Sequence, residues 1–265
     1  MISPREILLA FLLPALVCVL LGALAARVRE GWPRRSLQAC AMALSYGLAS
    51  FAIAGYIPLL TPLSSATDLV PLLALAVALL AALLTPDQFL WRALPLVLAT
   101  GLLVCFFNRL ASPPAWPERG VALLALVAAW SLSREGSAGR PVWRPLLALG
   151  TFAGAVALAC ICGRVASLAL VAGGLGVSIG ACFLVCLRWP GWSFARPGLD
   201  VGVFALGGTL VCAVYLGELA PLAALALLAA LAASRLPRFT HAFGAQLALT
   251  GLGLWLAWPA DGLVS

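Results

Sequence analysis

The chain has 265 residues, of which 64% are hydrophobic and only 9% are charged. Soluble domains are about 45–50% apolar and about 25% charged, so a water-soluble fold of this length could not bury so much apolar surface. The net charge of +7 comes from arginine, because the chain contains no lysine. No basic run with interleaved aromatic residues occurs, which argues against nucleic-acid binding. The composition instead predicts a lipid bilayer as the surrounding medium.

Hydrophobic runs recur from one end of the chain to the other. A transmembrane helix needs roughly 17–25 mostly apolar residues, and Pro, Gly or a charge marks each break. We therefore predict an all-α, polytopic transmembrane helical bundle of about ten spans with short loops, forming a single integral membrane domain over residues 1–265. The predicted spans are 6–26, 37–58, 69–85, 93–110, 119–133, 145–163, 166–187, 198–217, 219–234 and 242–259.

Three features of this assignment leave alternatives. Residues 162–164 alone separate the sixth and seventh spans, and residues 217–221 alone separate the eighth and ninth. Residues 6–26 could instead be a cleaved signal peptide, because residues 23–25 form an acceptable cleavage sequence. The length of the apolar run and the arginines that follow it favour a retained span.

The arginines predict an orientation. Twelve of the sixteen lie in alternate connecting segments, beginning with the segment after the first span. Because cytoplasmic loops carry the excess of positive charge, these segments should face the cytoplasm and both termini should lie outside. Seven of the nine tryptophans fall at span ends or in flanks, which is typical of an aromatic belt. We predict a multi-pass protein of a bacterial cytoplasmic (inner) membrane.

Acidic residues avoid the middle of every predicted span. Intramembrane carboxylates commonly mark proton or cation pathways, so their absence there argues against an obvious ion path. Asp200 and Glu218 come nearest, at the two ends of the eighth span. Asp200 is interpreted either as a helix cap paired with Arg196 or as a functional group, and Glu218 either as a hairpin residue or as a functional group.

Uncharged polar residues are the other candidates inside the spans. Tyr46 and Ser50 share a helix face at i, i+4, and so do Gln246 and Thr250. Such residues either hold helices together by hydrogen bonds or line a polar cavity. Glycine pairs spaced four apart, at 150 and 154 and at 176 and 180, predict close helix contact.

Asn108, Arg109 and Arg164 terminate helices on the predicted outer face. Arginine side chains reach from helix ends to the membrane surface, which accounts for them without a function. The alternative is an outer vestibule that attracts anions.

Catalytic and metal-binding patterns are weak. Residues 176–180 match G-x-S-x-G, but Ser178 lies in a continuous apolar run rather than at a strand-to-helix turn. His241, the only histidine, falls in the last predicted inner loop. All eight cysteines lie within predicted spans without a neighbouring histidine, so we predict no metal site, no cofactor and no enzymatic activity.

Two functions remain. The first is a small permease or transporter for a small or amphipathic substrate. The alternative is a non-catalytic membrane subunit, or an assembly or scaffold protein, that packs against partner membrane chains. A polar cavity lined by Tyr46, Ser50 and Gln246 would favour transport, whereas pairing of these residues between helices would favour the structural role.

Overall fold

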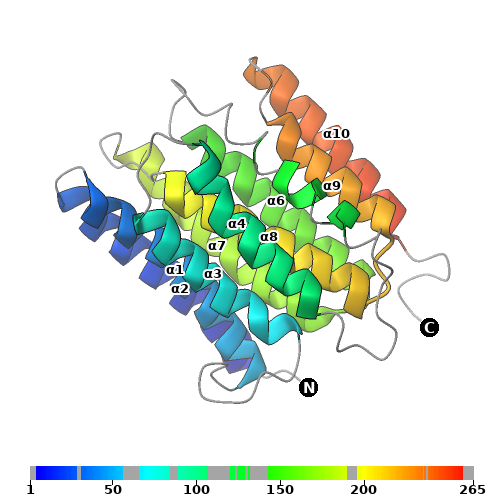
Figure 1. Cartoon of the computed structure of the whole chain (residues 1–265), viewed down its shortest axis with the longest axis horizontal. Coiled ribbons are helices and arrows are strands. Elements are labelled where there is room, and N and C mark those ends of the chain that lie inside the picture. Colours follow the sequence, from blue (N-terminus) through cyan, green and yellow to red (C-terminus); the bar gives the residue numbers. More distant parts are fainter. Residues whose placement is uncertain are drawn as a thin grey trace.

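The computed structural model describes residues 4–28, 31–55, 66–83, 89–106, 120–122, 124–128, 131, 143–189, 196–234, 236 and 238–258. Among these residues, regular secondary structure is helical throughout, as predicted (Figure 1). The helices are α1 (Pro4–Arg27), α2 (Trp32–Ala54), α3 (Ala66–Leu83), α4 (Phe89–Phe106), α6 (Trp143–Cys162), α7 (Ala166–Arg188), α8 (Arg196–Leu216), α9 (Pro221–Ala233) and α10 (Phe239–Ala257). Residues 120–122, 124–128 and 131 are also helical.

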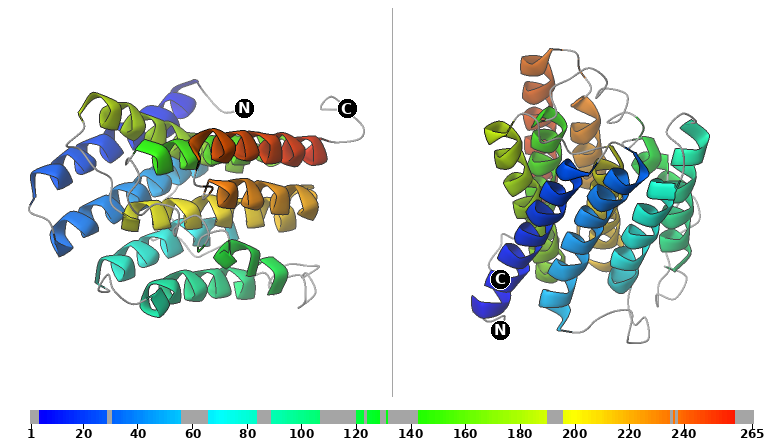
Figure 2. Two further views of the ribbon diagram at one scale, coloured as in Figure 1. Left: turned by 90° about the horizontal axis from the view of Figure 1, so that it is seen from above. Right: turned by 90° about the vertical axis from the view of Figure 1, so that its left-hand side faces the viewer.

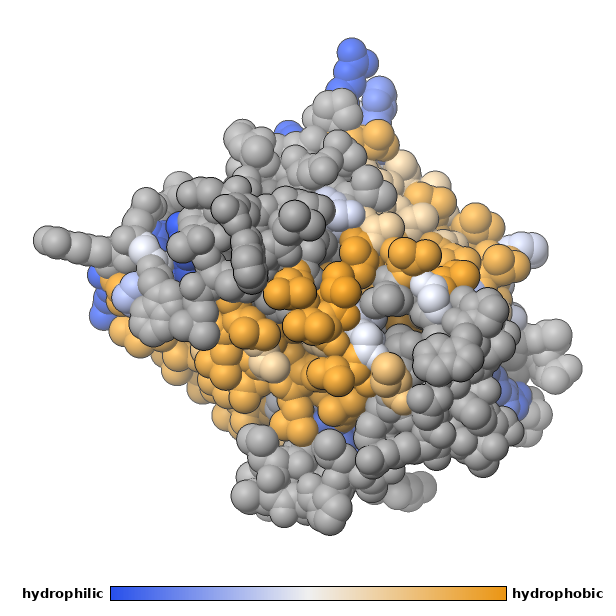
Figure 3. All heavy atoms as spheres, viewed as in Figure 1, coloured by the Kyte–Doolittle hydropathy of each residue, from blue (hydrophilic) through white to orange (hydrophobic). Residues whose placement is uncertain are grey.

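Five helical segments are long and apolar enough to cross a membrane, judged by length and composition: Leu8–Arg27, Pro33–Ala54, Trp143–Cys162, Ala166–Arg188 and Gly198–Leu216. Their outward faces are apolar as well. On α1, leucines at 8, 12, 16, 20 and 24 form an exposed stripe with a spacing of four residues. Figure 3 shows hydrophobic residues across the middle of one face of the molecule, with most of the hydrophilic ones at its margins. These features are compatible with a helical membrane protein.

Both weak breaks in the sequence are real helix ends. Helix α6 ends at Cys162 before α7 begins at Ala166, and α8 ends at Leu216 before α9 begins at Pro221. Proline is well suited to the first turn of a helix because the N–H that it lacks has no helical partner there. Several helices begin before the predicted spans, as α2 does at Trp32. Hydropathy marks the hydrocarbon layer, whereas a helix continues into the polar interface.

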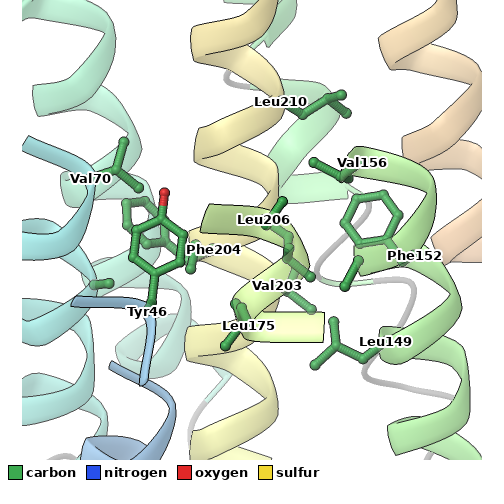
Figure 4. Packing of buried hydrophobic residues seen from close by; sticks show 14 of the residues in the cluster. Tyr46, Val70, Leu149, Phe152, Val156, Leu175, Val203, Phe204, Leu206 and Leu210 are labelled. Carbon is green, nitrogen blue, oxygen red and sulfur yellow. The ribbon is translucent and has the colours of Figure 1, made fainter. Parts of the chain in front are cut away.

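Helix α8 is the centre of the bundle. Residues 201–213 are all buried, and α2, α3, α4, α6, α7 and α9 pack around the helix. Gly202 faces Leu149 of α6, and Gly208 faces Val70 of α3 at 3.2 Å from the position of a Cβ. Figure 4 shows side chains of α6, among them Leu149 and Phe152, directed toward α8. The small residues of α8 therefore admit large side chains from several neighbours.

Helices α1 and α7 run in the same direction. Cys18 lies 3.4 Å from Cys182 between their sulfur atoms, and the Ala10 carbonyl lies against Gly174. In each pair the two residues are 164 apart in the sequence. A separation that stays constant along the contact means that the two helices are parallel. Helix α2 runs antiparallel to α1. Its Ser45 hydroxyl donates to the Pro14 carbonyl at 3.0 Å, and the later residue Ala49 meets the earlier residue Ala10 at Gly174.

Helices α6 and α7 are antiparallel. Gly150 of α6 lies near Ile179, and Gly176 of α7 lies near Ala153, with 3.6 and 3.2 Å between the respective Cβ positions and side-chain atoms. The first glycine of each predicted pair thus sits at the α6–α7 contact. The second, Gly154 or Gly180, has open space at its Cβ position.

The contacts place the arginine-bearing helix ends together. The end of α1 at Arg27 lies beside the end of α7 at Arg188 because these helices are parallel, and the start of α6 at Arg144 lies at that end too. Helix α10 is parallel to α6, with Phe239 at its start packed edge-on against Trp143 at 5.3 Å between ring centres. The start of α1 and the end of α10 lie toward the opposite end of the bundle (Figures 1 and 2).

Candidate functional site

A cavity of about 230 Å³ opens where α2 ends and α3 and α7 begin, at the end of the bundle opposite Arg27 and Arg188. Exposed Ala54 and Ser167 form part of its rim. Its lining combines one carboxylate and four hydroxyl groups with apolar side chains. The lining residues are Tyr46, Ser50, Ile53, Ala54, Thr67, Asp68, Pro71, Ser167, Leu168 and Val171.

Among these lining residues, Asp68 is the one with a charged side chain, and only 5% of its surface is exposed. It lies in the first turn of α3, where the helix dipole favours a negative charge. Sequence analysis placed Asp68 in a connecting segment, just before the span predicted from residue 69, and so missed it. The available signal was Asp68 itself, because acidic residues are enriched in the first turn of helices and indicate that α3 begins earlier than its hydropathy suggests.

Tyr46 forms the inner wall of the cavity and connects it to the central helix. Its hydroxyl oxygen lies 2.6 Å from Thr209 Oγ1 of α8, and Tyr46 is 1% exposed. Thr209 Oγ1 itself donates to the Ala205 carbonyl at 2.8 Å. Because a threonine hydroxyl has a single proton, Tyr46 must be the donor in its bond to Thr209.

Ser50 lies one turn after Tyr46 on α2 and lines the same cavity. Gln246 does not join them. Its Nε2 donates to the Ala148 carbonyl at 2.8 Å and to Thr151 Oγ1 at 2.7 Å, so it connects α10 to α6. Thr250 is half-buried on α10. Of the two predicted polar faces, one opens on a cavity and the other contains a contact between helices.

Glu218 and Arg164, assigned to separate outer turns, lie together. Arg164 Nη1 is 3.2 Å from Glu218 Oε2, and both side chains are exposed. The Glu218 N–H also donates to the Gly163 carbonyl at 3.0 Å. Arg164 has a left-handed backbone with φ of 58°. The ion pair balances the Arg164 charge locally, which weakens the anion-attracting interpretation at this residue.

The structure adds less about the remaining predicted site residues. Asn108 and Arg109 lie outside the described residues. Asp200 is half-buried in the second turn of α8, and the side chain of its predicted partner Arg196 also lies outside the described set.

Ser178 and His241 occupy different environments. The Ser178 hydroxyl is fully buried and donates to the Gly174 carbonyl at 3.0 Å. The His241 side chain is exposed near the start of α10, a helix that packs on α6 and α9. Within the described residues, no group of three or more His, Cys, Asp or Glu is arranged to hold a metal ion.

No family model, curated protein or solved structure matches the chain. Function is therefore inferred from the cavity and its surroundings.

Proposed function

We propose that this chain is a small permease of a bacterial cytoplasmic membrane, with about ten spans, and that the cavity between α2, α3 and α7 admits its substrate. One observation carries the proposal: a buried carboxylate, Asp68, and several hydroxyl groups line a hollow in a largely apolar bundle. Ionisable groups at membrane depth are expensive and usually mark substrate or ion pathways.

The distribution of arginine supports an outward-facing cavity. The helix ends at Arg27, Arg144 and Arg188 share one end of the bundle, with the N-cap of α10 at Arg238. The positive-inside rule assigns that end to the cytoplasm. The cavity and both termini then lie on the outer side. Reporter fusions after residues 35, 64, 140 and 238 test this: an outward signal at 35, 140 or 238, or an inward one at 64, would reverse the orientation.

The volume limits the substrate. Pockets for drug-sized ligands occupy about 300–1,000 Å³, and this cavity has about 230 Å³. The substrate that it admits is accordingly small. Apolar residues such as Ile53, Leu168 and Val171 share the lining with the polar groups, which suits a molecule with both polar and hydrocarbon parts.

Pairing between helices favours the alternative, a non-catalytic subunit or scaffold. Gln246 is 2% exposed and bonded to α6, and Tyr46 is bonded to α8. Polar residues used in this way stabilise a bundle without transporting anything. Ser50 and Asp68 both line the cavity, where a substrate could meet them.

Uptake into proteoliposomes separates the two functions. The full chain is reconstituted and offered labelled small amines, amino acids, sugars and carboxylates. Ser50→Leu fills the cavity, and Thr250→Leu is the matched control on α10. A permease takes up at least one class about tenfold faster than protein-free liposomes, and Ser50→Leu, but not Thr250→Leu, removes that uptake. Uptake at the background rate for every class would reject the proposal and favour the subunit.

A further inference from the structure

We infer that the starts of α6 and α10 together bind an anionic phospholipid, whose phosphate contacts the Arg144 guanidinium while an acyl chain follows an apolar stripe on α10. The inference goes beyond the proposed function, since it holds for a permease and for a scaffold alike. It is carried by the aromatic rings that hold Arg144, by the charge around it and by the side chains farther along α10.

Arg144 is held by aromatic rings rather than by a carboxylate. Its guanidinium carbon lies 5.1 Å from the ring centre of Phe239 and 5.7 Å from that of Trp143. A cation–π contact fixes a guanidinium without using its hydrogen-bond donors. Among the described residues, Arg144 has no hydrogen-bond or ion-pair partner, and its buried Nε lacks an acceptor.

The unused donors of Arg144 suit an anion. Arginine carries five N–H donors and accepts no hydrogen bond. The side chain is half-buried, and the burial without a partner extends to Nε but not to the two Nη atoms. The Nη groups therefore remain open to a phosphate, which arginine binds through paired N–H groups.

The surroundings of Arg144 are positive. Arg238, the N-cap of α10, is exposed, and the first turns of α6 and α10 contain no acidic residue. Asp200 lies toward the same end of the bundle, since Gly202 of α8 faces Leu149 of α6, but Arg144 is not its partner. Positive charge of this kind selects an anionic head group over a zwitterionic one, which brings an ammonium group of its own.

A hydrocarbon surface leads away from Arg144 along α10. Phe239, Phe243 and Leu247 follow one another at intervals of four residues and share one face of the helix. The two phenyl rings stack at 5.7 Å between their centres, and 49% of Leu247 is exposed. A free phosphate cannot use this surface, whereas an acyl chain covers it. A ligand with both a phosphate and a hydrocarbon chain is a phospholipid.

Arg188 provides the matched comparison. It also lies over a ring, 5.9 Å from the centre of Trp189, but its side chain is exposed. It stands in the last turn of α7, where the helix dipole favours a cation, whereas Arg144 stands in the first turn of α6, where the dipole opposes one. Both arginines serve the orientation of the chain equally, so orientation does not explain the half-buried place of Arg144.

Thermal unfolding of the purified full chain in mixed micelles tests the inference, with dioleoylphosphatidylglycerol as the probe. The lipid fraction at half-maximal stabilisation gives the affinity. Dioleoylphosphatidylethanolamine, dioleoylglycerol and inorganic phosphate represent the zwitterionic head group, the chains alone and the free anion. One arginine near an anionic surface contributes about 1 kcal/mol, or about fivefold in affinity.

We therefore expect phosphatidylglycerol to bind about fivefold more tightly than phosphatidylethanolamine, or better. Dioleoylglycerol and inorganic phosphate should neither stabilise the chain nor displace phosphatidylglycerol. Equal affinity for the two phospholipids, or displacement by inorganic phosphate, would overturn the inference.

Variants assign the head-group contact. Arg144→Gln should weaken phosphatidylglycerol binding about fivefold, whereas Arg188→Gln, which removes an equal charge, should change it less than about twofold. Arg144→Lys keeps the charge and should retain the preference for phosphatidylglycerol, which distinguishes a lost contact from a folding defect. Unchanged affinity in Arg144→Gln, or equal losses in the two glutamine variants, would contradict the site.

A second pair of variants assigns the acyl chain. Leu247→Asn places an amide on the apolar stripe and should weaken phosphatidylglycerol binding. Leu252→Asn makes the same change at a leucine that is similarly exposed but lies on another face of α10, and should leave the affinity unchanged. Equal effects of the two variants would show that the stripe does not bind the chain.

Discussion

Replacement of Gly174 by alanine should separate α1 from α7. Pro14 lies inside α1 and has no N–H, so the Ala10 carbonyl one turn earlier cannot accept the usual helical bond. A Cβ on Gly174 would clash with that carbonyl oxygen and would lie 3.0 Å from the Cβ of Ala49 on α2. Gly174 is therefore the point where three helices meet, and an added methyl group there has no space.

The magnitude follows from a comparison within α7. Overpacking typically costs about 1–3 kcal/mol, while alanine gains about 0.5–1 kcal/mol over glycine in a helix interior. Gly180 has no atom within 4 Å of its Cβ position, so Gly180→Ala receives the gain without the clash. Because both variants share the helix gain, the difference between their unfolding free energies isolates the packing cost. We expect Gly174→Ala to be about 1–3 kcal/mol less stable than Gly180→Ala.

Titration of the detergent-solubilised protein with sodium dodecyl sulfate, followed by far-ultraviolet circular dichroism, measures this difference. Wild type, Gly174→Ala and Gly180→Ala are compared at one protein concentration and in one mild detergent. If Gly174→Ala unfolds at the same denaturant fraction as Gly180→Ala, or at a higher one, α1 does not approach α7 through Gly174. The close parallel contact described above would then be wrong.

Three further predictions address other contacts. In a double-mutant cycle of Tyr46→Phe and Thr209→Val, the unfolding free energies should show a coupling of about 0.6 kcal/mol, the average for such hydrogen bonds in membranes. Additive effects of the two substitutions would mean that the two hydroxyl groups do not interact. Because left-handed backbone costs a non-glycine residue about 1–2 kcal/mol, Arg164→Gly should be more stable than Arg164→Ala by about 1 kcal/mol in thermal or denaturant unfolding, and the reverse order would exclude backbone strain there. Oxidation with copper phenanthroline should join Cys18 to Cys182, so that halves cut at a protease site inserted after residue 138 stay together on non-reducing gels. Serine at either position should release them, and release from the wild type would refute the proximity.

Local signals in the sequence were sufficient to predict the helices and two of their narrowest breaks. The turn at 162–164 combines a glycine with a charge, and that at 217–221 ends in a proline; each effect acts within a few residues. The structure has helix ends at both places. Most helix starts were predicted two to five residues late, while that of α7 was predicted at the observed residue and that of α9 two residues early. The late starts arise because polar residues such as Arg34 belong to a helix without belonging to its apolar part.

The candidate site depends on contacts that no local signal contains. The pairs Tyr46–Ser50 and Gln246–Thr250 have the same spacing and similar chemistry, yet the first pair lines a cavity while Gln246 bonds to α6. A helical spacing predicts that two side chains point the same way, but what covers them depends on helices far along the chain. Asp68 illustrates the same limit, since it is buried beside a cavity whose other lining residues come largely from α2 and α7.

Helix directions bear on the number of passes more directly than apolar length does. Gly208 touches both Val70 near the start of α3 and Leu103 near the end of α4, so these two helices are antiparallel, as are α1 and α2. Helix α3 is antiparallel to α2, because the two pack together and the end of α2 shares the cavity with the start of α3. Helix α4 then runs opposite to α1, and α6 does too, because α7 is parallel to α1 and antiparallel to α6. Helices α4 and α6 therefore run in the same direction, and the helical residues 120–122 and 124–128 lie between them in the sequence. The predicted order of ten spans requires equal directions for α4 and α6, because it places one further span between them.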